Sequence, residues 1–437
     1  CSPVLFIKNE GKRLIIKNVT IVNPDGITPD MDILIQNNII KKIGKDILQK
    51  EDVSIDAGGL FAFYGFCDMH SHLRDPGYLQ KEDIVSGTAA AAAGGFTTVC
   101  CMPNTNPVID SVDTLTYIID KAKKLGSVKV LPVACITKGM SGKTLTDFKE
   151  LKKAGAIAFS DDGMPVADDE VMIAAMKKAK ELGVPLLLHE ENLELRGAGI
   201  VNAGENAQKA GLAGIVRAAE ETMIARDLMY AQKYDVPIHL CHVSTQGGVE
   251  LIRRAKLSGI RVTCETTPHY FSIGDDQILN LNTNAKVNPP LREKKDIDAI
   301  RQGIADGTID AIATDHAPHT VSEKNTDMQS APFGMIGFET AFSLAITNLV
   351  HTGMIALQDV ARLMSAAPRR LLGISGGMIQ INEIADLTIC DIKENFVYTI
   401  EGIVSKSKNS PFINQKLCGR VKYTIVEGNL KYDRQTD

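Results

Sequence analysis

The stretch GFCDMHSHLRDPG, residues 65–77, places two histidines at the end of a short apolar strand. We expect the strand to run from Phe66 to Met69 and to deliver His70 and His72 just beyond it. Side chains two residues apart on a strand point to the same face, so both imidazoles can approach one metal ion. Imidazole nitrogen is a good zinc ligand. An HxH pair alone is weak evidence, and a metal site requires further ligands at other strand ends.

From Gly65 onward, apolar strands alternate with amphipathic helices. The strand candidates are FCDMH, FTTVCCMP, VKVLPVACI, AIAFSDD, PLLLHEEN, PIHLCHVS, IRVTCETTPHY and IDAIATDHAP. Apolar strands separated by helices indicate a parallel sheet that helices cover. Eight such units predict an α/β fold of the (β/α)8 TIM-barrel type. An open doubly wound sheet is the alternative, but no GxGxxG follows a strand and the chain has no P-loop.

The two ends of the chain carry short β-patterns of a different kind. RLIIKNVTIVN and MDILIQNNIIKKIG lie near the start, and ADLTICDI and VKYTIVEGNLKY lie near the end. No helix-length periodicity occurs in the first sixty residues. We therefore expect residues 1–60 and 380–437 to form one small composite β-sandwich domain, and residues 61–379 to form the barrel. Two separate β appendages are the alternative.

Composition and charge exclude several classes of partner. The 437 residues carry a net charge of −5 and a pI near 6.0, which gives no electrostatic reason to bind nucleic acid. No apolar run is long enough to span a membrane, and charges interrupt the apolar stretches of residues 1–18, so we expect no secretory signal. Nine scattered cysteines without a CxxC pair indicate reduced thiols. These features together predict a cytoplasmic protein.

Polar residues recur where the predicted strands end, which is where a (β/α)8 barrel places its chemistry. Beyond the first strand, the candidates are Asp161 and Asp162 in FSDDG, His189 in LLLHEEN, His239 and His242 in HLCHVS, and Asp315, His316 and His319 in ATDHAPH. One isolated strand-end histidine would more often be a hydrogen-bonded core residue than a ligand. So many histidines and aspartates at the strand ends of one barrel instead predict a metal site.

The sequence also ranks these candidates. His239 and His242 are three apart and should lie on opposite faces of their strand, so His242 is the better ligand and His239 should pack under a helix. Asp315 should point inward, and His316 should point outward. The inward set exceeds the four ligands that one zinc takes, so two ions that share a bridging carboxylate fit better. Spacing leaves open whether Asp161 or Asp162 forms that bridge.

Several motifs together resemble one known family. DMHSHLRDPG, GGFTTVCCMPNTNPV, FSDDG, CHVS, NPPLR and ATDHAPH are similar to motifs of class I bacterial dihydroorotases, in the amidohydrolase superfamily, over residues 56–385. The resemblance implies reversible, zinc-dependent cyclisation of N-carbamoyl-L-aspartate to L-dihydroorotate, a step of pyrimidine (UMP) biosynthesis. It also implies two Zn²⁺ ions bridged by Asp162, whose other ligands are His70, His72 and Asp315 for the first ion and His189 and His242 for the second.

The same resemblance implies roles in substrate binding and catalysis. The substrate-binding positions are His72, Arg74, Asn104, Asn288 and His319, with Phe333 and Gly334 acting through their backbone. Asp315 is the implied catalytic residue, which moves the proton when a metal-bound hydroxide attacks the ring amide. Arg74 offers the planar pair of donors that suits a substrate carboxylate.

Two alternative functions stay open. The first is a hydantoinase, dihydropyrimidinase or allantoinase type of cyclic amidase. Arg74 and the MPNTNPV loop argue against it, because those substrates lack a carboxylate. The absence of a lysine in FSDDG at the end of strand 4 agrees with the class I pattern. The second is a non-catalytic paralogue kept for assembly, which the complete set of six ligands disfavours.

The expected partners and one loop complete the sequence predictions. We expect a small-molecule substrate, no nucleic acid, no membrane and a homodimer, with association with aspartate transcarbamoylase left open. The polar segment 319–332 predicts a lid over the site, and a disordered surface loop is the alternative.

Overall fold

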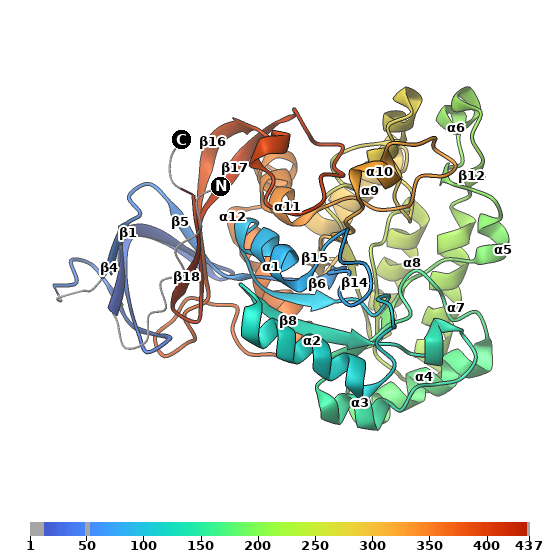
Figure 1. The fold of residues 1–437 in the computed structure, drawn as a ribbon, viewed down its shortest axis with the longest axis horizontal. Coiled ribbons are helices and arrows are strands. Elements are labelled where there is room, and N and C mark those ends of the chain that lie inside the picture. Colours follow the sequence, from blue (N-terminus) through green and yellow to red (C-terminus); the bar gives the residue numbers. More distant parts are fainter. Residues whose placement is uncertain (1–12, 49–52, 435–437) are drawn as a thin grey trace.

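The structure is a computed structural model that describes residues 13–48 and 53–434. The outermost parts of the predicted composite domain, and most of the stretch expected to lack a secretory signal, lie outside the described residues. Figure 1 shows strands from both ends of the chain on one side of the molecule and alternating strands and helices on the other.

Two four-stranded parallel sheets form the centre of the larger unit, in the orders β6-β7-β8-β9 and β10-β13-β14-β15. The strands are β6 (Phe66–Ser71), β7 (Phe96–Cys101), β8 (Lys129–Ala134), β9 (Ala158–Phe159), β10 (Leu187–Leu188), β13 (Ile238–Leu240), β14 (Val262–Thr266) and β15 (Ala311–Ile312). Isolated parallel bridges join Phe159 to Leu186 and Ser71 to His316, so the two sheets adjoin at both edges. Each of the eight predicted strand segments therefore contains a strand.

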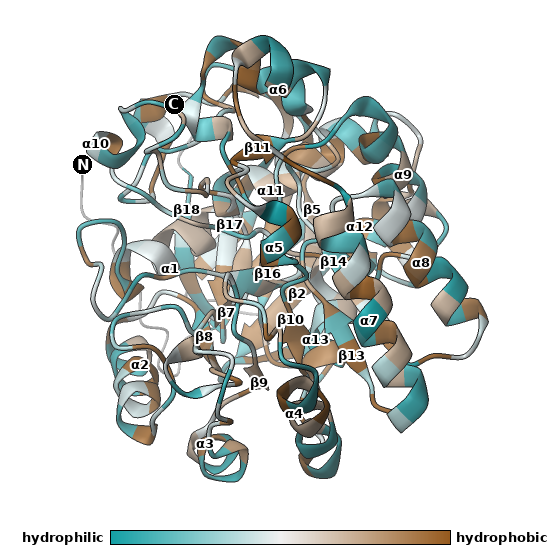
Figure 2. Ribbon diagram, turned by 90° about the vertical axis from the view of Figure 1, so that its right-hand side faces the viewer, coloured by the Kyte–Doolittle hydropathy of each residue, from teal (hydrophilic) through white to brown (hydrophobic). Residues whose placement is uncertain are grey.

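Helices follow these strands along the chain, and most of them after the largely buried α1 are amphipathic. They are α1 (Ile84–Ala93), α2 (Val112–Leu125), α3 (Phe148–Ala154), α4 (Asp169–Leu182), α7 (Ala218–Tyr234), α8 (Gln246–Leu257) and α9 (Lys294–Ala305). Helices α3 and α4 end at Gly155 and Gly183, whose φ angles of 116° and 63° favour glycine. The lysines followed by glycine in these two segments predict such helix ends. Figure 2 shows the helices around the strands, with hydrophilic residues on their outer faces.

Shorter elements, most of them not predicted, lie in the connections. They are η1 (Lys138–Met140), α5 (Leu193–Arg196), β11 (Val201–Asn202), α6 (Glu205–Ala210), β12 (Gly214–Ile215), η2 (Asp275–Asn280), η3 (Thr283–Ala285) and α10 (Val321–Lys324). After β15 come the predicted additional helices, α11 (Phe338–Ala345) with the π-turn η4 (Ile346–Val350), and α12 (Leu357–Ala361), η5 (Arg362–Ala366) and α13 (Ala367–Leu372).

Strands from both ends of the chain pair into one eight-stranded sheet, in the order β18-β17-β16-β5-β1-β2-β3 with β4 beside β1. The strands are β1 (Arg13–Asn23), β2 (Gly26–Gln36), β3 (Ile39–Gly44), β4 (Val53–Asp56), β5 (Phe61–Tyr64), β16 (Leu387–Val397), β17 (Lys416–Val426) and β18 (Asn429–Asp433). The antiparallel pairing of β16 with β5 joins the two ends, as predicted. Strand β5 follows residue 60 and still belongs to this sheet.

An aromatic cluster fixes the sheet against the larger unit. The Phe66 ring lies 5.7 Å from Phe63, 5.9 Å from Phe96 and 5.6 Å from Phe342 between ring centroids. These fully buried side chains come from β6, β5, β7 and α11. Because the first residue of β6 is packed in this cluster, the direction of the strand is fixed, and with it the position of His70 near its C-terminal end.

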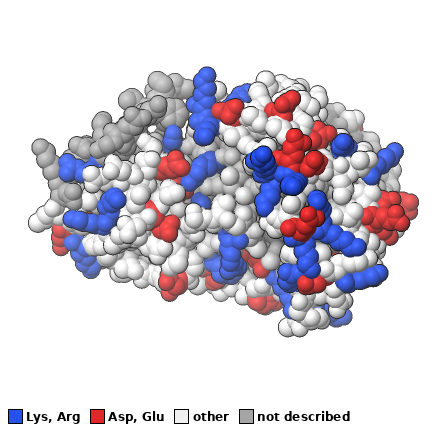
Figure 3. All heavy atoms as spheres, turned by 90° about the horizontal axis from the view of Figure 1, so that it is seen from below, with Lys and Arg blue, Asp and Glu red and all other residues white. Residues whose placement is uncertain are grey.

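The surface shown in Figure 3 is mixed in charge, and the described cysteines are buried. Lysine, arginine, aspartate and glutamate are interspersed on the face shown in Figure 3. Eight cysteines in the described ranges are free and buried. Among the same residues, no helix has the length and apolar character needed to cross a membrane.

Candidate active site

The ends of the parallel strands bring four imidazoles around the carboxylate of Asp162. Its oxygens lie 3.3 Å from His70 Nε2, 3.5 Å from His72 Nε2, and 3.4 Å from both His189 Nδ1 and His242 Nε2. All five side chains are buried. Burial raises the pKa of Asp162, but the imidazoles outweigh burial and lower that pKa well below its usual range.

Asp315 adjoins the same cluster from the end of β15. Its Oδ1 lies 2.9 Å from His72 Nε2 and 3.7 Å from His70 Nε2. Burial acts to raise its pKa, but the hydrogen bond with His72 and the charge of His70 prevail and lower the pKa to about 2. His316 points away from this cluster, as expected, and stacks on Phe338 with ring centroids 4.0 Å apart.

Left-handed backbone conformations aim two of these side chains. His242 has φ 36° and Asp315 has φ 46°, which is uncommon for residues other than glycine and is typical of functional sites. The prediction that His239 packs under a helix is wrong. His239 points into the interior one layer below, where its Nε2 lies 3.3 Å from Glu265. Strand alternation does not extend to His242, because β13 ends at Leu240.

The structure distinguishes the two adjacent aspartates that spacing could not separate. The Asp161 carboxylate turns away and accepts hydrogen bonds from the backbone N–H groups of Ile136 and Thr137 at 2.8 and 3.1 Å. Asp162 alone of the two faces the histidines. Asp161 therefore anchors the loop after β8.

A supporting layer of acidic residues, which sequence reasoning missed, lies below the histidines. Glu265 Oε1 lies 3.1 Å from His70 Nδ1, which leaves Nε2 of that ring directed at Asp162. Asp68 accepts hydrogen bonds from the backbone N–H groups of His70 and Thr314, and so ties β6 to the residue before Asp315. Both are buried charges inside strand segments, a signal that could have identified them because such groups need partners.

The donor set fits divalent metal ions. Two groups, His70–His72–Asp162 and Asp162–His189–His242, each place their ligand atoms within 4.8 Å of one another and share Asp162. His70 Nε2 is buried and has no hydrogen-bond partner among the described residues, as expected of a nitrogen that awaits a metal. Cys241 also adjoins His70 and Glu265, but burial raises the pKa of its thiol, which disfavours the thiolate needed for ligation.

Arg74 lies at the edge of this cluster with φ 61°. Its Nε donates to the carbonyl of Pro318 at 3.2 Å, and its Nη2 lies 3.4 Å from His319 Nε2. Burial and the charges of Arg74 and Lys81 lower the pKa of His319 far below its usual value, so this imidazole is neutral. Arg74 is thus held in place beside an uncharged ring.

Two asparagines that the sequence predicts to bind substrate lie beside the histidines around Asp162: Asn104 contacts His72 directly, and Asn288 contacts Glu191, a neighbour of His189. Asn104 Oδ1 accepts from His72 Nδ1 at 2.8 Å, which directs His72 Nε2 toward the carboxylates. Asn288 donates to Glu191 at 3.2 Å, and Glu191 in turn lies 3.5 Å from His189 Nε2. Glu191 was not singled out from the sequence, although it lies two residues after His189.

The segment predicted to be a lid is held by buried lysines. The Nζ atom of Lys324, on α10, lies 2.9, 3.3 and 2.8 Å from the backbone carbonyls of Thr283, Lys286 and Pro332 and donates to them. Phe333 and Gly334 are predicted to bind the substrate through their backbone, and several of these backbone groups form hydrogen bonds within the protein. The Phe333 carbonyl accepts from His319, and the Gly334 N–H donates to the Lys286 carbonyl at 2.9 Å.

Asn409 reaches the site from the C-terminal segment, and no sequence signal pointed to it. Its Oδ1 accepts from the His319 N–H at 3.0 Å, and its Nδ2 donates to the carbonyls of Ala317 and Gly334 at 3.0 and 3.1 Å. The side chain is buried. One amide therefore clamps together the two chain segments that carry His319 and Gly334.

These groups surround one cavity of about 360 Å³. Its lining includes most of the predicted site residues, namely His72, Arg74, Asn104, Asp162, His189, His242, Asn288, Asp315, His319, Phe333 and Gly334. His70 lies beneath them, fully buried. The histidines and aspartates of the cluster and Arg74 thus line the same cavity.

Comparisons with known proteins agree with this arrangement. Residues 59–248 match the family model described as Dihydro-orotase-like. A dihydroorotase of Geobacter metallireducens is 46% identical over 424 residues, which cover 97% of this chain and 100% of that protein. A dihydroorotase of Ruminiclostridium cellulolyticum is 48% identical over 417 residues, which cover 95% and 97%.

Solved structures extend the comparison to the fold. L-hydantoinase (dihydropyrimidinase) from Arthrobacter aurescens superposes with a TM-score of 0.87 and 26% identity over 97% of both chains. A D-hydantoinase, at 24% identity and a TM-score of 0.84, shares the fold. Fold and site together define a cyclic amide hydrolase of the amidohydrolase superfamily. Within that class, the chain belongs to the dihydroorotase family, which confirms the resemblance found in its motifs.

Proposed function

We propose that this enzyme interconverts N-carbamoyl-L-aspartate and L-dihydroorotate. The observation that carries the proposal is the position of Arg74, which lines the same cavity as the histidine–aspartate cluster. A cyclic amide with a carboxylate substituent can place its amide at that cluster and its carboxylate at Arg74. Hydantoin, dihydrouracil and allantoin have no carboxylate for this partner.

The metal side of the cavity is proposed to hold two zinc ions that share Asp162. The other ligands are His70, His72 and Asp315 for one ion, and His189 and His242 for the second. Histidine nitrogen and carboxylate oxygen are ligands that zinc accepts. Bound zinc would act as a Lewis acid toward water and toward the amide carbonyl.

The side chains have distinct proposed tasks in the reaction. Asp315, ionised and exposed to the cavity, takes a proton from the attacking water and gives it to the leaving ring nitrogen. Arg74 and the neutral His319 orient the ring through the substrate carboxylate. Asn104 keeps His72 in the tautomer that leaves its Nε2 free. Ring closure follows the same path in reverse.

We also infer the finer features of the architecture. The bridges Phe159–Leu186 and Ser71–His316 support a closed (β/α)8 barrel, built from residues 61–379. The branch of the terminal sheet at β1, which pairs with both β4 and β5 along one edge, supports a β-sandwich made from the two ends. A homodimer and binding to aspartate transcarbamoylase stay predictions, which light scattering with and without that enzyme would measure.

A comparison of substrates tests the proposed function. The purified protein is analysed for metal content, and its hydrolysis of L-dihydroorotate, dihydrouracil, hydantoin and allantoin is measured side by side. We expect about two zinc ions per chain and a clear preference for dihydroorotate. A higher kcat/KM for any uncharged ring would overturn the assignment of substrate.

A matched pair of variants isolates the carboxylate contact. Arg74→Gln should lose the preference for dihydroorotate over dihydrouracil. Arg196→Gln, a change of the same type at another arginine that lines the cavity, should keep that preference. If both variants lost the preference for dihydroorotate equally, the effect would come from the overall charge of the cavity and not from a contact with Arg74.

A further inference from the structure

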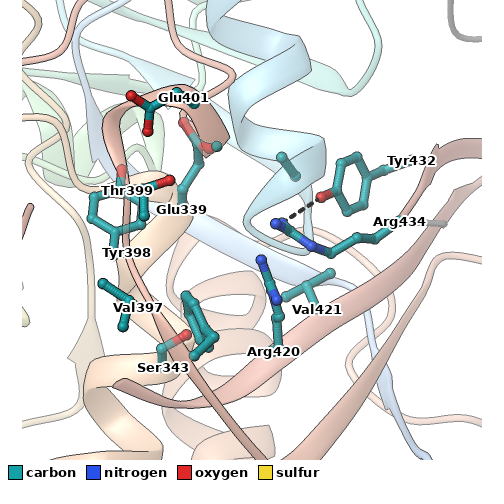
Figure 4. Close-up of a pocket in the computed structure, with 13 residues that line it drawn as sticks. Glu339, Ser343, Val397, Tyr398, Thr399, Glu401, Arg420, Val421, Tyr432 and Arg434 are labelled. Atoms are coloured by element: carbon teal, nitrogen blue, oxygen red, sulfur yellow. Dashed lines mark hydrogen bonds between the residues drawn. The ribbon is translucent and has the colours of Figure 1, made fainter. Parts of the chain in front are cut away.

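A second cavity lies where the C-terminal strands meet α1 and α11, apart from the active site. Its volume is about 570 Å³, within the range typical of small-molecule sites. Figure 4 shows its lining, which comes from α11, β16, β17, β18 and the turn after β16. None of the residues that line it also lines the active-site cavity.

The two arginines of this cavity are held in place by the protein. Arg420 Nη1 donates to Glu394 at 2.8 Å, and its guanidinium lies 4.5 Å from the centroid of the Phe396 ring. Arg434 Nη1 donates to the Tyr432 hydroxyl at 3.1 Å. Such fixed guanidinium groups bind a carboxylate at little cost in side-chain entropy.

Two of the residues that line this cavity also carry buried polar atoms without partners. The Tyr398 hydroxyl is buried and makes no hydrogen bond within the described part of the chain, and the residue is only 5% exposed. Arg420 Nε is likewise buried and unbonded there. Buried polar groups in folded proteins are almost always satisfied, so these atoms indicate a missing partner.

The charges of the cavity are separated. In Figure 4 the carboxylates of Glu339 and Glu401 lie away from the guanidinium groups of Arg420 and Arg434. Glu339 accepts hydrogen bonds from the backbone N–H groups of Val404 and Ser405, which fix its position. Desolvation raises the pKa of Glu339 to about 7, so it is mostly ionised at pH 8. A ligand with opposite charges at its two ends would match this lining.

We propose that this cavity is a second binding site, which takes a small zwitterion of the amino-acid class. The carboxylate of the ligand lies between Arg420 and Arg434, and its ammonium faces Glu339 and Glu401 and donates to the Tyr398 hydroxyl, which lies on the side of the two glutamates. Because the lining comes from α11 on one side and from β16, β17 and β18 on the other, the bound molecule connects the larger unit to the terminal sheet.

Calorimetry on the metal-loaded protein at pH 8 tests the proposal, with the twenty standard L-amino acids as probes. At least one should bind saturably with a Kd below about 1 mM. Acetate and methylammonium, which carry one charge each, should bind at least about tenfold more weakly. The Arg74→Gln variant should bind that amino acid equally well, which separates this cavity from the active site and from the proposed function.

Two substitutions locate the binding. Tyr398→Phe removes only a hydroxyl without a partner, so the protein should fold and lose about fivefold or more in affinity. Arg434→Gln should lose more, while Tyr423→Phe, outside the cavity, should change nothing. Absence of binding by every amino acid up to about 10 mM, or unchanged affinity in both Tyr398→Phe and Arg434→Gln, would overturn the proposal.

Discussion

Replacing Asn409 by aspartate changes one atom group and tests how the C-terminal segment supports the active site. The new side chain keeps the oxygen that accepts from the His319 N–H. It replaces the amide that donates to the carbonyls of Ala317 and Gly334 by a second acceptor. Two buried carbonyl groups then face a carboxylate oxygen.

The structure gives the size of the effect. Loss of two buried hydrogen bonds costs about 1 kcal/mol each, and leaving both carbonyls unsatisfied raises the total to about 3–4 kcal/mol. Most of this cost falls on the segments that carry His319 and Gly334. If movement of those segments relieves about half of this cost, the lost positioning of His319 and Gly334 weakens substrate binding by about 1.5–2 kcal/mol. We therefore expect KM for dihydroorotate to rise about 13-fold to 30-fold.

Steady-state kinetics and metal analysis measure this outcome. The expected variant has a raised KM, a kcat changed by less than about threefold and an unchanged metal content. Asn395→Asp is the matched control, because this exposed asparagine lies on β16 of the same C-terminal region. An Asn409→Asp enzyme with lower stability but an unchanged KM would refute the clamp, because the amide would then support only the fold.

Three further predictions concern single side chains. Asp315→Asn should lose more than about 100-fold in turnover in both directions while far-UV circular dichroism shows a folded protein, and an active variant would exclude the proton transfer. Arg74→Ala should raise KM for dihydroorotate at least about 100-fold with metal content kept, as measured by kinetics and elemental analysis. Burial and the charge of Lys286 lower the pKa of Lys324 to about 7, whereas an unfolded lysine titrates near about 10.4. Between these two pKa values the lysine is protonated in the unfolded chain but not in the folded protein. The free energy of unfolding should therefore rise between about pH 7 and about pH 10, by up to about 1.4 kcal/mol per pH unit. Urea unfolding measured across this range should show a smaller rise for Lys324→Met.

The arrangement of strands was predictable because its signal is local. Each strand is an apolar run followed by a helix, several of these helices end in a lysine-containing turn followed by glycine, and all eight strand segments contain a strand. The insertion between β10 and α7 was missed because α5, β11, α6 and β12 are each only two to six residues long. Elements of that length show too little periodicity to be recognised.

Which side chains converge was predictable only in part. The strand-end rule brought Asp162, His189 and Asp315 to one place, but counting along β13 gave the wrong direction for His239. That count assumes an extended backbone, and the left-handed φ of His242 breaks the assumption. A single residue with positive φ therefore reverses the face that alternation assigns, and the sequence carries no sign of it when the residue is not glycine.

Long-range support of the site is the part that no local pattern contains. Glu265 and Asp68 could have been suspected, because a charge inside an apolar strand needs a partner. Asn409 could not, because an asparagine in a polar segment has no unusual feature until its three partners are known. The histidines around Asp162 lie at or just beyond the ends of the parallel strands. The clamp on His319 and Gly334 comes from the C-terminal segment, so substrate recognition depends on that segment more than metal binding does.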